Sequence, residues 1–500
     1  MIETIIGDEL EKSHVPGLAV GIVQGDKLAF VKCHGYTDVE GKIPITPATA
    51  FHWASISKLF TCIGIFQQWE ENKFKLNDPV NHYLSKGKLL RKKQSWPEVT
   101  FEHLLTHTAG IGELRRGADL FRKGFRLLTY DEKPVPPLST LHDLPLHLSS
   151  PAGKKYAYSN IGGSLLGFLT EIFSGEDFQA YMIQRVLDPL GMVHSDFDNS
   201  DRVNDRLARG YKYKKGTLQL AKPWHNIIKP SGGLVTPLDD MVKFAACLLR
   251  KGKFDGKQLL KPETLDLIWT PHYWAHESLK ETDAIGYIFR IQQLNGKKIL
   301  WHTGGMSGFT ATLDLIPGDG VALLTEANLG ESLHSRITFR LRHRILKVLT
   351  GATDAFDPSR YQPDTTWWPD IKGHYGGYPG WLSNTRVIVN GIDFKVQEKD
   401  GHLVLSSLFG EHKNGTVLYP TADPLVYEYP RGDAGDIDYT SSIGFTRSQK
   451  TGKVIEMSIG DMDKLRKNPG WRTFRFTISM LVIIAVTTLS LLAILDLFTR

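Results

Sequence analysis

The sequence predicts a mixed α/β domain over residues 1–350, a small antiparallel β domain over residues 371–460 and a C-terminal transmembrane helix over residues 476–495. Three observations lead to this architecture. Strand-like and helix-like patterns alternate up to residue 350, short alternating runs follow a Pro- and Asp-rich stretch, and an uncharged apolar run lies near the end. The chain has 500 residues, 41% hydrophobic and 23% charged, which is typical of a globular protein with more than one domain.

The first domain begins with a hairpin pattern and continues with amphipathic segments. Leu18–Val23 and Leu28–Val31 are apolar runs joined by the turn sequence Gln24–Asp26, which predicts two antiparallel strands. A helix is expected to begin at Thr236 and Pro237, because Thr is a capping residue and Pro is favoured at the first helical position. Strands and helices mixed in this way indicate a sheet packed against helices.

Composition changes near residue 350. Residues 351–370 are rich in Pro, Asp and Thr, which predicts a linker. The adjacent Trp367 and Trp368 are expected to anchor this linker onto the first domain. Beyond it, short runs separated by Gly, Asn and Asp predict a small antiparallel barrel or sandwich. The expected strands are Thr385–Val389, Phe394–Gln397, His402–Leu405, Val417–Tyr419 and Leu425–Tyr429.

Five of the six units of net charge lie between Lys464 and Arg475, within a basic segment, residues 461–475, which is expected to lie beside the membrane. Outside the stretch from Lys464 to Arg475 the chain is nearly neutral, so a nucleic-acid partner is excluded. Residues 476–495 carry no charge, and about 20 apolar residues span a bilayer as a helix. A buried core helix is the alternative, but such a helix would normally show a polar stripe. The cations of the basic segment are Lys464, Arg466, Lys467, Arg472 and Arg475.

The two ends of the chain predict on which side of the membrane the body lies. Residues 1–14 are acidic and contain no apolar signal-peptide core. Positive charges flanking a span favour the cytoplasmic side. We therefore expect a single-pass C-terminal anchor with residues 1 to about 470 in the cytosol. Cys33, Cys62 and Cys247 are too few and too far apart for a disulfide scaffold or a CxxC zinc site.

The first candidate motif for chemistry is Ser-x-x-Lys at Ser55 and Lys58. A serine hydroxyl is a weak nucleophile unless an adjacent group takes its proton, and residues three apart share one face of a helix. A second match, Ser85 and Lys88, lies in a basic, turn-like stretch and is expected to be solvated surface. Apolar residues surround Ser55 and Lys58, which predicts a buried helix and favours this pair.

Two further motifs follow along the chain, Tyr-Ser-Asn at residues 158–160 and His-Thr-Gly-Gly at residues 302–305. A phenol near cations can act as a general base, and an adjacent amide can hold a carbonyl group. Glycines at the end of a strand let a substrate lie along its edge, where a backbone N–H can stabilise an oxyanion. Taken singly, each motif is read as an ordinary loop or turn.

In this order the three motifs resemble the active-site set of the serine β-lactamase and penicillin-binding-protein superfamily. The closer likeness is to the branch of class C β-lactamases, DD-peptidases and esterases, because class A enzymes carry Ser-Asp-Asn at the second motif. The resemblance covers roughly residues 5–350, and the β-rich tail is similar to the lipocalin-like appendage of some family peptidases and esterases. Other segments like this branch are Val15–Gly17, Leu104–Gly110, Pro189–Met192 and Ser231–Leu234.

The resemblance implies a β-lactamase-like fold and roles for the residues of the first two motifs. Ser55 is the implied nucleophile and Lys58 its activating partner. Tyr158 is the implied general base that later activates water, and Asn160 is implied to contact the substrate amide.

The third motif is implied to bind substrate through His302, Thr303 and Gly304. The backbone N–H groups of Ser55 and Gly305 are implied to form the oxyanion hole. His302 stands where β-lactamases usually have Lys, which weakens a reading as an antibiotic-hydrolysing enzyme, because histidine is not a permanent cation at neutral pH.

We therefore expect a serine hydrolase that acts through a Ser55 acyl-enzyme on an amide or ester, with a small-molecule or peptide substrate and no cofactor. His103 and His107 have a zinc-binding spacing, but no acid completes a site, so no metal is expected. Two alternatives stay open. One is a D-alanyl-D-alanine carboxypeptidase or β-lactamase acting on the cell wall or antibiotics, and the other is a catalytically silent membrane-anchored binding protein. The oligomeric state is also left open.

Overall fold

The computed structural model arranges the chain in two units. Met1–Trp274 with Leu279–Asp354 forms the first unit, and Ala275–Ser278 with Ala355–Arg500 forms the second. The assignment of residues 275–278 to the second unit differs from the predicted division near residue 350. The structure describes residues 1–112, 128–129, 135–143, 145–222, 225–330, 337–352, 357–377, 393–408, 410–431, 439–459 and 463–469.

The first unit is built around a nine-stranded sheet with the order β14-β15-β16-β17-β18-β19-β1-β2-β3, in which neighbours are antiparallel. The predicted hairpin is confirmed as β1 and β2. β1 is buried along all but its last residue, because both faces of the sheet are covered. The strands are β1 (Gly17–Gln24), β2 (Lys27–Asp38), β3 (Ile43–Pro44), β14 (Tyr273–Trp274), β15 (Asp283–Ile285), β16 (Arg290–Leu294), β17 (Lys297–Met306), β18 (Phe309–Ile316) and β19 (Val321–Ala327).

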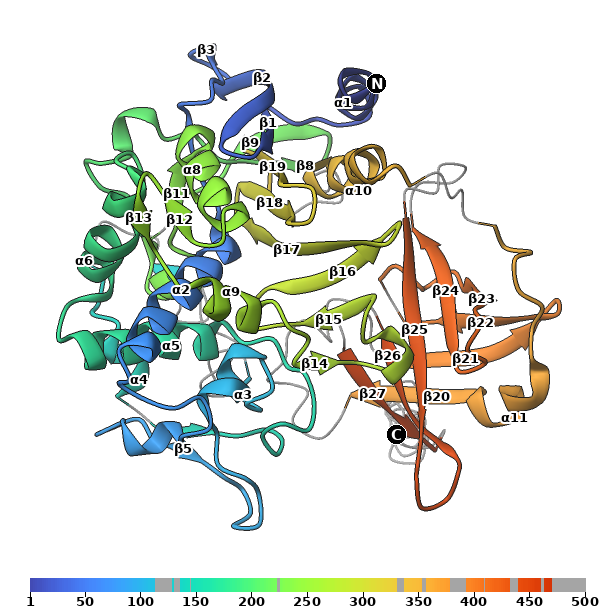
Figure 1. Cartoon of the computed structure of the whole chain (residues 1–500). Coiled ribbons are helices and arrows are strands. Elements are labelled where there is room, and N and C mark those ends of the chain that lie inside the picture. Colours follow the sequence, from blue (N-terminus) through green and yellow to red (C-terminus); the bar gives the residue numbers. More distant parts are fainter. Residues whose placement is uncertain are drawn as a thin grey trace, which may run out of the picture. The chain divides into compact units, whose positions relative to one another are not determined.

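Helices lie on both faces of the sheet (Figure 1), and alternate residues of its central strands belong to two different apolar clusters. On β19, Ala322 and Leu324 face the core built with α2, α5 and α8, whereas Val321 and Leu323 face α1 and α10. The helices are α1 (Ile2–Glu11), α2 (Ser57–Glu70), α3 (Phe101–Leu105), α4 (Ser139–His142), α5 (Asn160–Ser174), α6 (Phe178–Met182), α7 (Lys229–Gly232), α8 (Leu238–Leu249), α9 (Pro262–Ile268) and α10 (Ile337–Thr350). Two-stranded sheets pair β4 (Ala50–His52) with β11 (Val235–Pro237), β5 (Leu89–Leu90) with β7 (Leu146–His147), β6 (Leu128–Thr129) with β10 (His225–Asn226), β8 (Tyr211–Lys214) with β9 (Thr217–Leu220), and β12 (Lys253–Phe254) with β13 (Lys257–Gln258).

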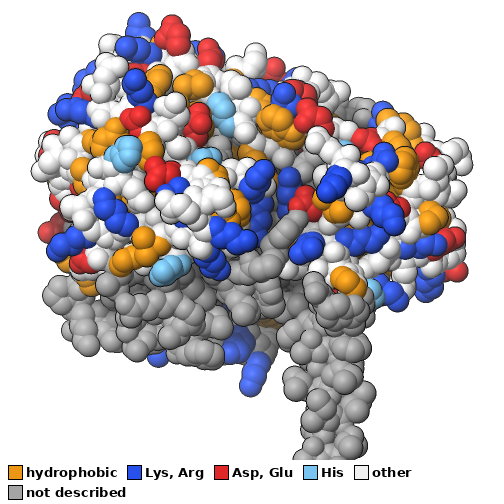
Figure 2. Space-filling model, turned by 90° about the horizontal axis from the view of Figure 1, so that it is seen from below, with side chains coloured by type: hydrophobic (Ala, Val, Ile, Leu, Met, Phe, Trp, Pro, Cys, Tyr) orange, Lys and Arg blue, Asp and Glu red, His pale blue; other side chains and the backbone are white. Residues whose placement is uncertain are grey.

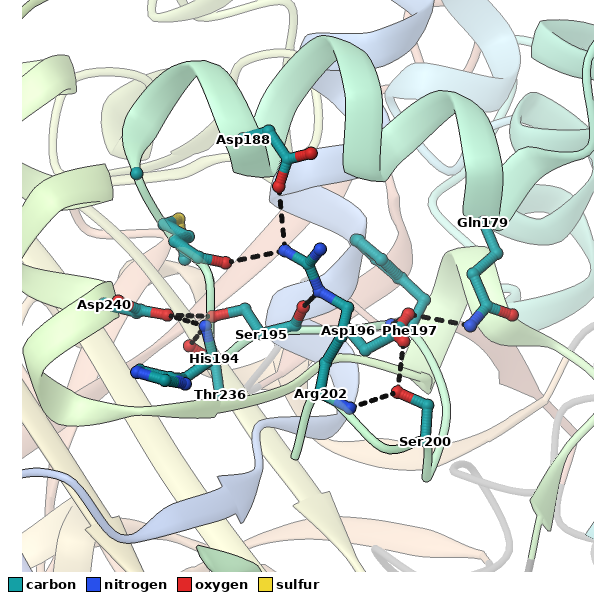
Figure 3. Close-up of polar contacts among 12 residues, drawn as sticks. Gln179, Asp188, His194, Ser195, Asp196, Phe197, Ser200, Arg202, Thr236 and Asp240 are labelled. Carbon is teal, nitrogen blue, oxygen red and sulfur yellow. Dashed lines mark hydrogen bonds and ion pairs between the residues drawn. The ribbon is translucent and has the colours of Figure 1, made fainter. Parts of the chain in front are cut away.

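A network of buried polar groups lies at the start of α8 (Figure 3). The helix begins at Leu238, and Thr236 lies on β11 instead of capping it, so the predicted cap is wrong. The Thr236 hydroxyl lies 2.6 Å from the Ser195 hydroxyl, which donates to Asp240 Oδ2 at 2.8 Å. The backbone N–H of His194 also donates to this oxygen, at 2.9 Å. The network therefore holds β11 in place, and β11 pairs with β4 immediately before Ser55.

Replacing Asp240 by alanine is expected to lower the free energy of unfolding by about 3 kcal/mol, because it leaves buried donors at His194 and Ser195 without their acceptor. Urea unfolding of the variant measures this loss. The matched control is Asp201→Ala, which removes an exposed carboxylate from the neighbouring loop and should change stability by less than about 0.5 kcal/mol. Equal stability of the two variants would contradict the structural role of Asp240.

The second unit contains a closed antiparallel barrel, which decides between the predicted barrel and sandwich. Its apolar core includes Tyr375, Phe394, Tyr429 and Phe445. Four of the five predicted strands correspond to β21–β24, and the fifth, Thr385–Val389, lies outside the described residues. The barrel strands are β20 (Gly373–Gly377), β21 (Phe394–Lys399), β22 (His402–Ser406), β23 (Thr416–Pro420), β24 (Val426–Arg431), β25 (Tyr439–Arg447), β26 (Val454–Ile459) and β27 (Asp463–Asn468).

The last strand corrects the predicted boundary at residue 460. β27 pairs with β26 on one side and with β20 on the other, so it closes the barrel, and Leu465 is buried in the core. Lys464, Arg466 and Lys467 are therefore strand residues, and the predicted basic segment 461–475 begins inside the barrel. A strand of alternating polarity is easily read as a charged linker when its single buried residue is the only apolar one.

The tryptophan pair also belongs to the second unit. Trp368, in the short helix α11 (Trp368–Ile371), is buried in the barrel core and its indole N–H donates to the Tyr427 hydroxyl at 3.1 Å. The Arg447 guanidinium lies 4.0 Å from the Trp367 ring centre. The expected anchoring onto the first domain is replaced by packing against the barrel.

No helix in the described part of the chain is long and apolar enough to span a membrane. The predicted span, residues 476–495, lies outside the described residues. Figure 2 shows cationic, acidic and apolar side chains interspersed on the face that it draws, as expected for a body of nearly neutral charge.

Candidate active site

Ser55 lies on a short turn that leads into α2, here called the Ser55 turn (Trp53–Ser57). Ser55 is half-buried, whereas the other residues of the turn are buried. Ala54 has φ 48°, a left-handed conformation that is strained for a residue with a side chain. The surrounding structure holds this strain: the Ser57 hydroxyl donates to the Ala54 carbonyl at 2.5 Å, and the Leu234 N–H donates to the Ser57 hydroxyl at 2.9 Å. The turn therefore presents Ser55 from a fixed backbone.

Lys58 joins the first two motifs. Its side chain is buried, and its ammonium nitrogen donates to Ser55 Oγ at 3.1 Å and to Asn160 Oδ1 at 2.8 Å. A third bond, to the Ser231 carbonyl, measures 2.6 Å. An ammonium group has three N–H donors, so these three contacts fix its position. The predicted Ser55, Lys58 and Asn160 therefore meet, although Asn160 lies about a hundred residues further along the chain.

Tyr158 and Asn160 are positioned by the start of α5. Ser159 caps this helix by accepting a bond from the Gly162 N–H at 3.0 Å, which places Asn160 as its first residue. The Tyr158 ring is buried, and its centre lies 4.8 Å from Lys58 Nζ. The aromatic ring and the ammonium are thus in cation–π range. This arrangement places a phenol beside the ammonium that contacts Ser55.

The third motif lies on β17 and completes the cluster. His302 is buried, and its ring centre lies 6.3 Å from that of Tyr158. His302 Nδ1 lies 2.8 Å from the Thr303 carbonyl oxygen. Since a carbonyl can only accept, Nδ1 carries a proton, and the protonation of Nε2 decides the charge of the ring. The structure thus brings His302 to the cluster with its Nδ1 bound to the backbone.

The glycines of this motif explain how β17 approaches the Ser55 turn. A Cβ atom added at Gly304 would lie 2.0 Å from the Trp53 carbonyl oxygen, so only glycine fits there. Gly305 is exposed, and a Cβ atom there would meet no other atom within 4 Å. β17 therefore contacts the Ser55 turn closely at Gly304. It leaves open space at Gly305, which is the residue predicted to contribute to the oxyanion hole.

Two residues of the cluster carry no role in the sequence analysis. The ring centre of His107 lies 4.5 Å from that of Tyr158, and its Nδ1 accepts a long bond from the Ser159 N–H at 3.4 Å. Ser231 contributes the carbonyl that binds Lys58. Both lie in segments noted for their likeness to the superfamily, and His107 was otherwise considered only as a zinc ligand. The positive backbone φ of His107 and the carbonyl contact of Ser231 leave no recognisable pattern in a single sequence.

The second Ser-x-x-Lys match is confirmed as surface. Ser85 is exposed, and Lys88 Nζ donates to the Asn81 carbonyl at 2.7 Å and to the Leu84 carbonyl. Lys88 therefore stabilises its own turn.

Comparison with known proteins assigns this chain to a family. The family model described as Beta-lactamase matches residues 2–343. Protein flp of Staphylococcus aureus (strain MRSA252) is 26% identical over 364 residues, covering 72% of this chain and 69% of that protein.

Solved structures show the same fold. The octameric penicillin-binding protein homologue from Pyrococcus abyssi has a TM-score of 0.59 and 23% identity, with 93% of this chain and 99% of that chain covered. The D-amino acid amidase from Ochrobactrum anthropi SV3 has a TM-score of 0.55 and 19% identity, with 70% and 97% covered. Because the family match spans most of the chain, the protein belongs to the beta-lactamase family, a family of serine hydrolases.

Proposed function

We propose that this protein hydrolyses amide or ester bonds through an acyl-enzyme formed on Ser55. The observation that carries the proposal is the position of Lys58, whose ammonium contacts both Ser55 Oγ and Asn160 Oδ1 from a buried site. A lysine with no role at the site would be expected on the surface, because removing an ammonium group from water is unfavourable. A lysine that controls the proton of a serine requires this placement.

The residues support a two-step cycle. Ser55 Oγ attacks the carbonyl carbon while its proton passes to the Lys58 and Tyr158 pair, which reacts in the form that holds one proton fewer than an ammonium and a phenol together. The backbone N–H groups of Ser55 and Gly305 hold the oxyanion, and the leaving amine or alcohol departs with a proton. Tyr158 then takes a proton from water, which attacks the acyl carbon and releases the acid as Ser55 Oγ is reprotonated.

A burst of p-nitrophenol from a short-chain p-nitrophenyl ester tests this cycle. One equivalent released faster than the steady-state rate is expected if acylation precedes a slower hydrolysis of the acyl-enzyme. Absence of any turnover across esters and amides would favour the catalytically silent binding protein.

We further propose that the preferred substrates lack a carboxylate beside the scissile bond, as amino-acid amides and esters do. His302 replaces a permanent cation at the substrate edge, and its Nδ1–H is already engaged with the Thr303 carbonyl. One related fold is a D-amino acid amidase, and an Aspergillus campestris relative at 26% identity is named unguisins hydrolase. The alternative is a carboxypeptidase or β-lactamase.

A substrate panel with a matched variant tests this preference. We expect kcat/KM for amino-acid amides to exceed that for a D-alanyl-D-alanine peptide and a chromogenic cephalosporin. His302→Lys should raise kcat/KM for the two carboxylate-bearing substrates about tenfold, because a charged donor adds a charge-assisted hydrogen bond. A wild type that prefers the D-alanyl-D-alanine peptide would contradict the proposal and favour the cell-wall alternative.

We also propose that residues 476–495 anchor the protein in a membrane with the catalytic body on the cytosolic side. The uncharged apolar run supports the anchor, and Arg472 and Arg475 support the orientation. Protease treatment of sealed vesicles should leave residues 1 to about 470 intact when the cytosolic face is enclosed. Digestion of the body in such vesicles would contradict this orientation.

A further inference from the structure

Glu326 places a carboxylic acid in the core of the first unit. It lies on β19, its side chain is 0% exposed, and neither carboxyl oxygen has a hydrogen-bond partner among the described residues. By contrast Asp314, an equally buried acid on β18, is paired with Arg342 at 2.7 Å. A buried carboxylate without a partner is strongly unfavourable, so Glu326 calls for a physical explanation.

The sheet register places Glu326 on the same face as the Ser55 turn. Residues directly opposite one another in antiparallel strands share a face. The row that contains Glu326 is otherwise made of small residues and ends at Gly304, which contacts the Trp53 carbonyl. In order across the sheet the row is Cys33, Ala19, Glu326, Ala311 and Gly304.

Trp53 connects this row to Ser55. Its side chain is fully buried, and its indole N–H donates to the Thr236 carbonyl at 3.0 Å. The same side chain favours the ionised form of Glu326, which opposes the effect of burial on the pKa of that carboxyl. The Trp53 indole therefore has two possible acceptors, the neutral Thr236 carbonyl and the Glu326 carboxyl, which can become charged.

The electrostatic surroundings favour the protonated form of Glu326. Burial raises its pKa well above the ordinary value, Asp239 adds to the rise, and the Trp53 side chain opposes it. Burial also raises the pKa of the Cys33 thiol to about 11, with Glu326 and Asp239 adding to it. Asp239 on α8 and Cys33 on β2 are thus both acids. The other residues of the row, Ala19, Ala311 and Gly304, carry no ionisable side chain.

We infer that Glu326 is a positioning residue for the Ser55 turn, and that its neutral carboxyl leaves the Trp53 indole bound to Thr236. Loss of the proton to solvent offers the indole a charged acceptor, and hydrogen bonds to charged groups are roughly twice as strong as neutral ones. Trp53 then moves toward Glu326. The inference rests on the proposed role of Ser55 as nucleophile.

A movement of Trp53 also displaces Ser55, because the backbone between the two residues is tightly constrained. Ala54 is held at φ 48°, and the Trp53 carbonyl packs directly against Gly304. A displacement of about 1 Å in a reacting group can lower a rate roughly a hundredfold. Ionisation of Glu326 should therefore lower kcat while leaving KM nearly unchanged.

The test compares the wild type with Glu326→Gln, which is neutral at every pH, and with Glu326→Leu as a second neutral variant of similar size. Both should match the kcat of the wild type within about threefold at neutral pH. As pH rises, kcat of the wild type should fall at least about tenfold relative to either variant, with KM changing less than about twofold. Asp314→Asn, on the opposite face of the sheet, should keep the alkaline decline of the wild type.

Infrared difference spectra between the wild type and Glu326→Gln supply a second readout that does not require activity. The carbonyl stretch of a protonated carboxylic acid should be present at neutral pH and should disappear over the pH range in which kcat falls. Absence of the band at neutral pH, its persistence until the protein unfolds, or its loss without a change in relative kcat would each overturn the inference.

The pH dependence of unfolding separates this inference from the proposed function. Because the folded-state pKa of Glu326 is raised, its contribution to stability is complete below the unfolded-state pKa and is lost as pH rises toward the folded-state pKa. The folding equilibrium constant of the wild type relative to Glu326→Gln should fall up to tenfold for each pH unit in that window. This result is expected even if Ser55 proves not to be the nucleophile.

Discussion

Replacement of Ser55 by alanine should lower kcat by roughly 10⁴-fold or more and abolish covalent labelling by a fluorophosphonate or penicillin probe. The hydroxyl oxygen is the atom that would form the acyl bond, and the remaining site can only bind and polarise the substrate. The fold should be unaffected, because Ser55 is half-buried and the turn is held by Ser57. Intact-mass spectrometry after labelling measures the loss directly.

The chain supplies its own control for this experiment. Ser85 and Lys88 repeat the Ser-x-x-Lys spacing on the surface, so Ser85→Ala should retain labelling and full activity. Undiminished labelling of Ser55→Ala would reject the assignment of the nucleophile.

Lys58→Met should lower kcat by about 10³-fold with a smaller effect on KM. Methionine has nearly the same length and is tolerated in a buried site, but it cannot exchange a proton with Ser55 or donate to Asn160. The loss therefore falls on the chemical step more than on binding. Steady-state kinetics with a p-nitrophenyl ester separate the two effects.

A surface lysine again provides the comparison. Lys88→Met removes an ammonium that donates to the Asn81 and Leu84 carbonyls of its own turn and should leave kcat unchanged. If Lys58→Met retained more than a tenth of the wild-type kcat while remaining folded, Lys58 would not be the activating group. The effect of Lys58→Met on melting temperature reports the folding of the variant independently.

The sequence identified the residues that cluster at the candidate site better than it identified their surroundings. Ser55, Lys58, Tyr158, Asn160 and His302 were recognisable because each motif has a short, ordered pattern. The supporting contacts were not, since they come from isolated backbone groups such as the Ser231 carbonyl, which binds Lys58 from a distant segment. A carbonyl is present at every residue, so only the folded chain identifies the one that acts.

The barrel shows that prediction of the fold from sequence has the same limit. Alternating runs predicted β21–β24, but β27 was read as a basic segment because Lys464, Arg466 and Lys467 outnumber its one buried apolar residue, Leu465. Pairing of β27 with β20 is a contact between the two ends of the barrel sequence. Such non-local pairing leaves no signal in the residues themselves.

Glu326 is the clearest case of a feature that only the tertiary structure reveals. Within the strand sequence of β19 it is one acid among apolar residues, and nothing in that pattern assigns it a face or a partner. By itself the sequence determined the α/β class, the β-rich second unit and the order of three reactive motifs, because periodicity and motif spacing are local properties. Tertiary structure alone decided which groups meet Lys58, which strand closes the barrel and which buried acid lies behind the Ser55 turn, because burial and charge depend on neighbours from distant parts of the chain.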